Sequence, residues 1–222
     1  MVTLETERAI GTILIAAAVP QKLQDFRLLS GRLGSGVECL VTGMGPRSGE
    51  AVRRRLAKKD VRLVVSTGFA GGVRPGFHTG DLVLASEVIH APTGDRHKPV
   101  SSYFSLSDRA SVGPFVTVEK ALPDPKAKAW AGNRFGAIAV DMESAAVAQA
   151  ADEAGVAWAA IRVILDPMEK PLVVRSRAHA LRLLAAPRRW KEFFGFLQTV
   201  RLASRSLAGG LNDLIERRKR WI

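Results

Sequence analysis

The stretch from residue 136 to residue 150, GAIAVDMESAAVAQA, constrains the fold of this chain more than any other. Its residues 137–140 are a short apolar run, which predicts a buried strand. Asp141, Met142 and Glu143 follow, and small residues then begin a predicted helix. Acidic side chains at a strand-to-helix junction lie at the edge where open α/β sheets bind their ligands.

The two acids of this stretch allow two interpretations. Asp141 and Glu143 flank Met142, so in extended backbone both carboxylates point the same way, and a carboxylate there can hold a pair of sugar hydroxyls. Alternatively, Asp141 caps the helix and Glu143 is a first-turn acid that the helix dipole favours. Spacing alone does not decide between them.

Length and composition predict one α/β domain with a substantial core, since 47% of the 222 residues are hydrophobic. The longest apolar run, Ile10 to Val19, is about half of the roughly 20 residues that a membrane-spanning helix requires. Glu5 and Glu7 precede it, where a signal peptide would carry basic residues. Cys39 is the single cysteine, so an internal disulfide is excluded. We expect a cytoplasmic protein.

The formal net charge is +12, and half of this excess lies in residues 187–222. Such a basic excess attracts the phosphates of nucleic acids, lipids or small ligands alike. The basic residues are dispersed, aromatic residues are only 6%, and no nucleic-acid motif is present, so no nucleic-acid partner is expected. His78, His90 and His97 lack metal-ligand spacing, which predicts no metal site and no cofactor.

Apolar runs alternate with helical patterns along the chain. Strands are expected near residues 10–18, 34–42, 61–66, 80–85, 115–118, 137–140 and 156–165. Helices are expected near 20–29, 48–58, 124–130, 141–154, 175–185, 190–207 and 211–220. We interpret TGFAGGV, residues 67–73, as a glycine loop that lets a ligand approach the backbone closely. The polar stretch 90–113 is predicted to be a long loop.

Asp166 ends the last predicted strand and precedes Pro167. An aspartate at the carboxyl end of a central strand is well placed for chemistry. The alternative is that it merely initiates a turn before the proline.

Four segments stand in a distinctive order: TGFAGG at 67–72, GDLV at 80–83, VDME at 140–143 and IRVILD at 161–166. In this order and spacing the chain resembles the purine nucleoside phosphorylase and methylthioadenosine/adenosylhomocysteine nucleosidase superfamily, over about residues 10–166. The resemblance implies a single α/β domain built on a twisted mixed sheet flanked by helices. It also implies cleavage of the N-ribosidic bond of a purine nucleoside, by water or by inorganic phosphate as co-substrate.

The resemblance carries roles onto individual residues. Glu143 matches the carboxylate that holds ribose hydroxyls, Met142 matches the apolar neighbour of sugar and base, and Asp166 matches the acid at purine N7. Substrate contacts are also implied for Phe69, Ala70 and Gly71. These residue types suit the reaction, because nearby negative charge favours an oxocarbenium-like sugar and the leaving purine needs a proton.

The chain departs from the family pattern on the nucleophile side. Lys22 stands where nucleosidases carry a water-activating glutamate, and Phe69 stands where serine is common. Lys22, Gly45 and Arg47 remain candidates for binding an anion such as phosphate. Two hypotheses follow: an enzyme that breaks an adenosyl N-glycosidic bond, which we favour, and a catalytically silent member that binds a nucleoside.

Within the superfamily the chain resembles the phosphorylase-like proteins of hopanoid lipid biosynthesis, which implies adenosylhopane as substrate and release of adenine. We expect residues 1–186 to form the phosphorylase-like domain and residues 187–222 a basic helical extension of it. Basic residues beside Trp221 suit an anionic membrane surface, so we expect peripheral binding at the inner face of the membrane. Removing residues 211–222 should then leave the fold intact. A homo-oligomer is also expected.

Overall fold

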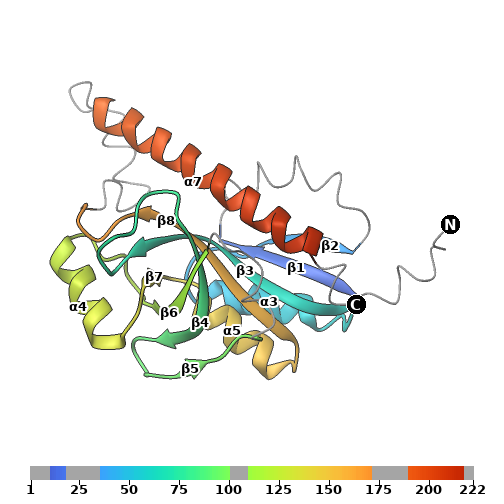
Figure 1. Ribbon diagram of the computed structural model, residues 1–222. Coiled ribbons are helices and arrows are strands. Elements are labelled where there is room, and N and C mark those ends of the chain that lie inside the picture. The colour runs from blue at the N-terminus through green and yellow to red at the C-terminus, as the bar shows by residue number, and fades with distance from the viewer. Residues whose placement is uncertain (1–10, 19–35, 101–109, 172–189, 218–222) are drawn as a thin grey trace.

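The computed structural model describes residues 11–18, 36–100, 110–171 and 190–217 (Figure 1). Its strands are β1 (Thr12–Ala17), β2 (Val37–Val41), β3 (Val61–Gly72), β4 (Leu82–His90), β5 (Arg96–His97), β6 (Ala110–Thr117), β7 (Ala139–Asp141) and β8 (Ala157–Asp166). Its helices are α3 (Arg47–Leu56), α4 (Pro125–Phe135), α5 (Ser144–Glu153) and α7 (Trp190–Arg217).

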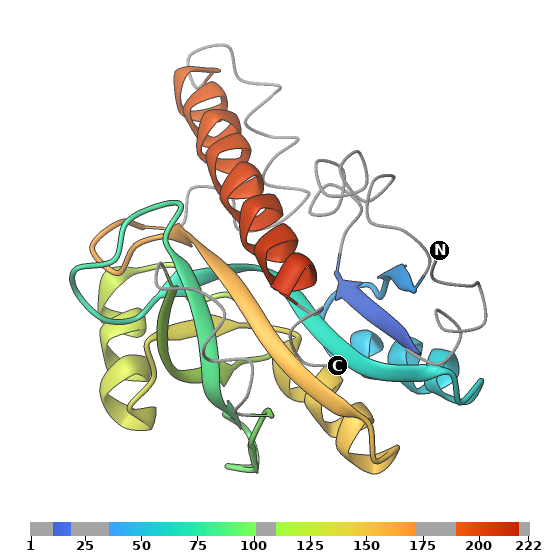
Figure 2. The same cartoon turned by 45° about the vertical axis from the view of Figure 1, so that its right-hand side comes forward.

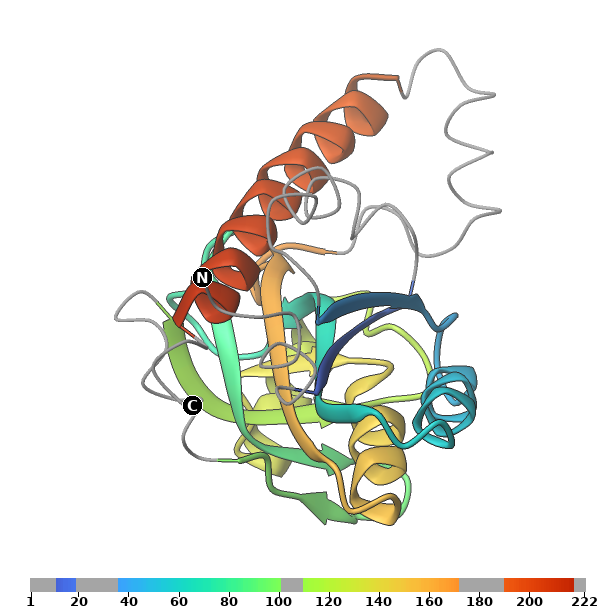
Figure 3. The ribbon, with the colours of Figure 1, turned by 90° about the vertical axis from the view of Figure 1, so that its right-hand side faces the viewer.

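The described strands form one mixed eight-stranded sheet in the order β2-β1-β3-β7-β6-β4-β5. Strand β8 pairs with both β3 and β4, parallel to the first and antiparallel to the second. The pairings β3-β7-β6-β4-β8 therefore close into a ring, whose curved strands can be followed in Figure 3. The predicted α/β fold with a single mixed sheet and flanking helices is confirmed.

Helices cover both sides of this sheet (Figure 2). On one side α3 and α5 bury residues such as Val52 and Val147 against the strands. The two helices approach closely, because a Cβ built on Gly49 would lie 2.7 Å from the carbonyl oxygen of Ala146. On the other side, α7 packs Leu207 and its neighbours against a second core cluster.

The short helix α4 is fixed at both ends. Asp124 caps it by accepting a hydrogen bond from the Ala127 N–H at 2.9 Å, and Pro125 occupies the first turn. Gly136 ends the helix with φ of +67°, a left-handed conformation that glycine adopts without strain. Gly132 lies so close to β3 that an added Cβ would be 2.1 Å from the Val73 carbonyl oxygen.

The glycine segment is not the predicted loop, because it forms the second half of β3. Gly71 and Gly72 pair with Val140 and Ala139 of β7. A Cβ built on Gly71 would lie 3.1 Å from the Val140 side chain and 3.3 Å from Asp166 Oδ2. Absence of a side chain here allows β7 and the end of β8 to approach the strand.

The two C-terminal helices predicted around a break at Gly209 and Gly210 are one continuous helix of 28 residues. Gly210 packs against the Leu82 side chain, where a Cβ would lie 2.8 Å from the leucine methyl carbons. The following residues Leu211, Leu214 and Ile215 are buried in the core. This burial contradicts the prediction that residues 211–222 can be removed without affecting the fold, because Leu211, Leu214 and Ile215 belong to the core.

The helices predicted near residues 20–29 and 175–185 lie outside the described residues. In the described ranges no helix is both long and apolar enough to cross a membrane.

Candidate active site

A pocket of about 230 Å³ opens where β3, β7 and β8 end. Most of its lining is apolar, with three carboxylates on its walls. The lining comprises Met44, Phe69, Ala70, Gly71, Val118, Ala121, Leu122, Val140, Asp141, Met142, Glu143, Leu165 and Asp166. The six residues predicted to act on or bind the substrate (Asp166, Glu143, Met142, Phe69, Ala70 and Gly71) are therefore brought together.

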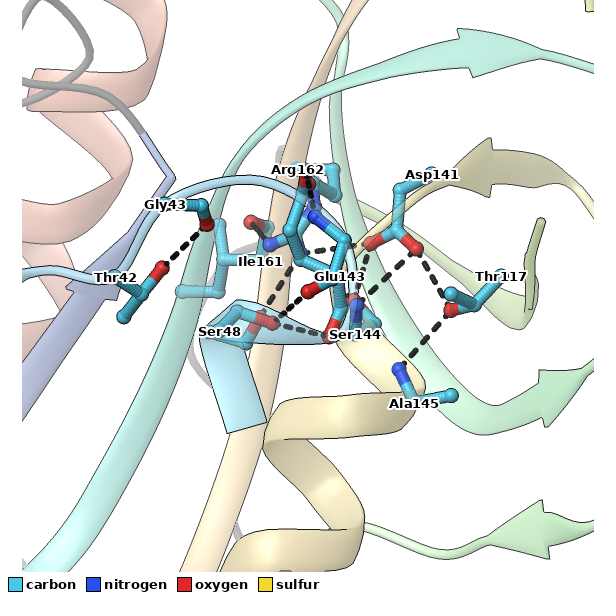
Figure 4. Close-up of polar contacts among 12 residues, drawn as sticks. Thr42, Gly43, Ser48, Thr117, Asp141, Glu143, Ser144, Ala145, Ile161 and Arg162 are labelled. Atoms are coloured by element: carbon cyan, nitrogen blue, oxygen red, sulfur yellow. Dashed lines mark hydrogen bonds and ion pairs between the residues drawn. The ribbon is translucent and has the colours of Figure 1, made fainter. Parts of the chain in front are cut away.

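Glu143 lies at the junction of β7 and α5 and is 8% exposed. Its Oε1 accepts a hydrogen bond from the Gly45 N–H at 3.3 Å. The hydroxyl of Ser48 donates to the Gly45 carbonyl at 2.7 Å and approaches the Glu143 carbonyl at 3.5 Å (Figure 4). The turn that begins α3 thus holds the Glu143 carboxylate at the pocket wall.

Of the three candidate anion-binding residues, the two that the structure describes, Gly45 and Arg47, do not form an anion site at the pocket. The Gly45 N–H is engaged by Glu143, and Arg47 is exposed and absent from the described pocket lining. Lys22 lies outside the described residues.

Asp141 is part of a buried polar network and is not a second sugar-binding carboxylate. It forms an ion pair with Arg162 Nη2 at 2.7 Å and accepts a hydrogen bond from Thr117 Oγ1 at 2.8 Å (Figure 4). It also accepts hydrogen bonds from the N–H and the hydroxyl of Ser144, at the start of α5. Asp141 therefore supports the start of α5 through the Ser144 N–H, whereas Glu143 occupies the N-cap position and faces the pocket.

Arg162 is fully buried in β8, and its role was missed by sequence reasoning. Besides Asp141, its Nη2 contacts the hydroxyls of Ser66 at 2.9 Å and Ser144 at 2.8 Å. The signal was available, because a single cation inside an apolar strand requires a buried partner.

Asp166 ends β8 with its side chain 16% exposed, and its Oδ2 lies 2.5 Å from Lys128 Nζ. Burial raises the pKa of the Asp166 carboxyl above its ordinary value, while the Lys128 ammonium opposes that rise by its charge and its hydrogen bond. A carboxyl with a raised pKa at a pocket wall keeps its proton to a higher pH than an exposed aspartate does, which suits a proton donor.

Lys128 was also missed, and its sequence surroundings gave no signal. It lies on α4 two residues from Lys126, which is exposed, whereas the Lys128 side chain is fully buried. Only the packing of α4 against the turn after β8 distinguishes the two lysines.

The predicted absence of a metal site meets no contrary observation within the described ranges. No group of three or more histidine, cysteine, aspartate and glutamate side chains there is arranged to hold a metal ion. His97 instead pairs with Asp152 at 2.7 Å, and His90 contacts the Thr93 hydroxyl at 2.9 Å.

Two sequence comparisons place this chain among known proteins. A family model described as the phosphorylase superfamily matches residues 10–186. A 5′-methylthioadenosine/S-adenosylhomocysteine nucleosidase of Geobacillus thermodenitrificans is 27% identical, over 47% of this chain and 55% of the relative. The chain thus spans about half the length of the curated relatives it matches.

Solved structures share the fold. The 5′-methylthioadenosine/S-adenosylhomocysteine nucleosidase of Helicobacter pylori, crystallised with a pyrrolidine-based ligand, superposes with a TM-score of 0.72 at 16% identity, covering 94% of this chain and 99% of the other. The futalosine hydrolase of the same organism gives 0.73 at 16%, with the same coverage. Since the family model spans most of the sequence, this chain belongs to the phosphorylase superfamily.

Proposed function

We propose that this protein cleaves the N-ribosidic bond of a purine nucleoside. The observation that carries the proposal is the meeting of Glu143 and Asp166 in one largely apolar pocket. The nucleosidase relative and the fold shared with nucleosidases and a futalosine hydrolase support the same reaction class.

The two carboxyl groups divide the chemistry. Glu143, held by the Gly45 N–H, would accept hydrogen bonds from the ribose hydroxyls. As the bond between C1′ and N9 breaks, its electron pair passes to the purine, and the Asp166 carboxyl donates a proton to N7. Positive charge develops on the sugar, so the nearby Glu143 carboxylate stabilises the transition state more than the ground state. A nucleophile then bonds to C1′; when it is water, it releases one proton, which passes to the Asp166 carboxylate or to solvent and leaves ribose with a hydroxyl at C1′.

The pocket favours a nucleoside with an apolar substituent. Met44, Leu122 and Leu165 line it beside Phe69, and Met44 is 55% exposed at this site. We infer an adenine nucleoside with an apolar 5′ group, for which adenosylhopane is the lipid-linked candidate. Peripheral membrane contact and a homo-oligomer belong to this finer proposal, and the buried part of α7 takes no part in that contact.

The nucleophile is the remaining part of the proposal. We propose water over phosphate, because the Gly45 N–H is occupied by Glu143 and Arg47 lies away from the pocket lining. Adenine release should therefore not require inorganic phosphate. With Lys22 in place of the water-activating glutamate of nucleosidases, the attacking water would have to be activated by another group.

The experiment measures adenine release by chromatography from methylthioadenosine and from a lipid-linked adenosine, with and without phosphate. Asp166→Asn should lower kcat by about 10² to 10⁴, the usual contribution of a general acid. Glu169→Gln alters an exposed carboxylate three residues away and is the matched control. Nucleoside binding without any adenine release would overturn the proposal and identify a silent binding protein.

A further inference from the structure

The charged side chain of Lys128 is buried beside the candidate site, in contact with Asp166. Its side chain is 0% exposed, and its Nζ lies 2.5 Å from Asp166 Oδ2. The same ammonium donates hydrogen bonds to the carbonyl oxygens of Asp166 at 3.3 Å, Pro167 at 3.0 Å and Lys170 at 2.8 Å. Four oxygens surround three protons, an environment that satisfies a charged ammonium.

Through this ion pair and these hydrogen bonds, Lys128 contacts both the Asp166 carboxylate and the backbone that carries it. Residues 167–170 form the turn after β8, and α4 is anchored independently by its Asp124 cap and its contact with Val73. On its other side, Oδ2 faces Gly71, where a Cβ would lie 3.3 Å away. The carboxylate is therefore confined between α4 and β3.

The charge of Lys128 is important because the pocket near Asp166 also contains two other carboxylates. Glu143 and Asp141 line the same pocket from β7 and its junction with α5, and Asp141 is already paired with Arg162. Lys128, from α4, is the cation that contacts Asp166 among the described residues. Its charge favours the ionised form of Asp166 and opposes the effect of burial.

We propose that Lys128 is a positioning residue for Asp166, fixing the orientation of this carboxyl through a direct ion pair without touching the substrate. The inference rests on the proposed function. It assigns Oδ2 to Lys128 and leaves Oδ1 to the purine. A purely structural alternative exists, in which Lys128 only holds the turn after β8 and has no influence on the carboxyl.

Carboxyl titration separates these accounts without any need for activity. Aspartate labelled with ¹³C at the carboxyl carbon is followed by NMR, and the Asp166 signal is identified by its loss in Asp166→Asn. In Lys128→Met this carboxyl should titrate about 1 to 3 pH units higher, the range an adjacent opposite charge produces. Lys126→Met, an exposed lysine on the same helix, is the matched control and should leave the titration unchanged. An unchanged titration in Lys128→Met overturns the proposal.

Kinetics then test whether Lys128 acts through Asp166. Lys128→Met should lower kcat at least about tenfold, change KM less, and move the alkaline limb of the pH profile upward. In the Asp166→Asn background the same substitution should have little further effect, because the group it acts on is gone. Losses that simply add in the double variant overturn the proposal.

Two further measurements keep the proposal testable if Lys128→Met does not fold. Lys128→Gln keeps N–H donors for the turn but removes the charge, and it should show the same upward titration. The double variant Lys128→Met, Asp166→Asn should melt above Lys128→Met, because it leaves no unpaired buried carboxylate. A double variant that melts no higher overturns the proposal. If the unmodified protein releases no purine, the proposed function fails while the titration still decides the role of Lys128.

Discussion

The Arg162 guanidinium and the Asp141 carboxylate form an ion pair of 2.7 Å in which each side chain is only 1% exposed. It joins β8 to β7, two strands that both pair with β3. Asp141 also accepts a hydrogen bond from the Ser144 N–H, so the ion pair fixes the junction of β7 and α5. Glu143 lies within this junction, so the ion pair positions the proposed ribose-binding carboxylate.

Arg162→Met should therefore destabilise the protein strongly. Removing one partner leaves Asp141 buried and uncompensated, which typically costs about 3–5 kcal/mol. Urea denaturation measures the loss. Adding Asp141→Asn should restore part of the stability, and a double variant no more stable than Arg162→Met would contradict this account.

Gly71→Ala should disturb the site more than the fold. The new Cβ would lie 3.1 Å from Val140 and 3.3 Å from Asp166 Oδ2, so Asp166 must shift by a few tenths of an ångström. Displacing a reacting group by such amounts is expected to lower kcat by about tenfold.

Gly72→Ala is the matched control for this prediction, because its Cβ would meet its nearest atom, the backbone nitrogen of Met168, at an ordinary 3.5 Å. Steady-state kinetics of adenine release should separate the two variants. Equal rates for both would show that the close approach at Gly71 is irrelevant to activity.

Leu211→Ala tests whether the end of α7 is part of the core. Leu211 is 0% exposed, and truncating a buried leucine typically costs about 2–5 kcal/mol. Leu202 lies on the same helix but is 52% exposed, so Leu202→Ala should change stability by about 0.5 kcal/mol or less. Thermal unfolding of the two variants measures the contrast, and a stable Leu211→Ala would argue that this segment is peripheral after all.

Asp60 should make the free energy of unfolding vary with pH in the acidic range. Hydrogen bonds from Arg55 lower the pKa of the Asp60 carboxyl from 3.8 to about 2. Because the folded-state pKa is depressed, the stabilisation is complete at pH values above 3.8 and is lost as the pH falls through about 2.

The Tm difference between the unmodified protein and Asp60→Asn should therefore shrink as the pH is lowered from 5 toward 2. Glu50→Gln removes a surface pair whose charged atoms lie 3.9 Å apart, and it should change Tm little at any pH. A difference for Asp60→Asn that stays constant over the whole range would exclude the linkage.

The strands could be predicted because their apolar runs are long enough to be recognised without knowledge of their partners. Val61 to Ser66 corresponds to the first half of β3, and Val156 to Leu165 overlaps nearly all of β8. The glycine segment was misread as a loop, since glycine usually interrupts strands. Here it continues β3, because β7 and Asp166 approach too closely for side chains.

The same cause explains the missed continuity of α7. Paired glycines usually end helices, yet Gly210 is buried against Leu82, and the close contact outweighs its poor helix propensity. Close approaches between segments distant in sequence cannot be predicted from either segment alone.

At the site, sequence resemblance identified Glu143 and Asp166, while their supports were missed. Lys128 and Arg162 act through partners on other elements, 38 and 21 positions away. The position of a partner is a property of the tertiary structure. A charged residue within an apolar strand can signal the need for one, as at Arg162, whereas a lysine on a short helix gives no such sign.

The closed ring of strands also affects how this protein can fold during synthesis on the ribosome. Strand β8 is synthesised after β3, β4, β6 and β7, yet it is the strand that joins β3 to β4. Until it arrives, β3 and β4 each present an unsatisfied backbone edge, a known template for misassociation between chains. These edges stay open until residues 157–166 have left the exit tunnel, and the pairing of β8 that closes them also completes the Asp166 wall of the pocket.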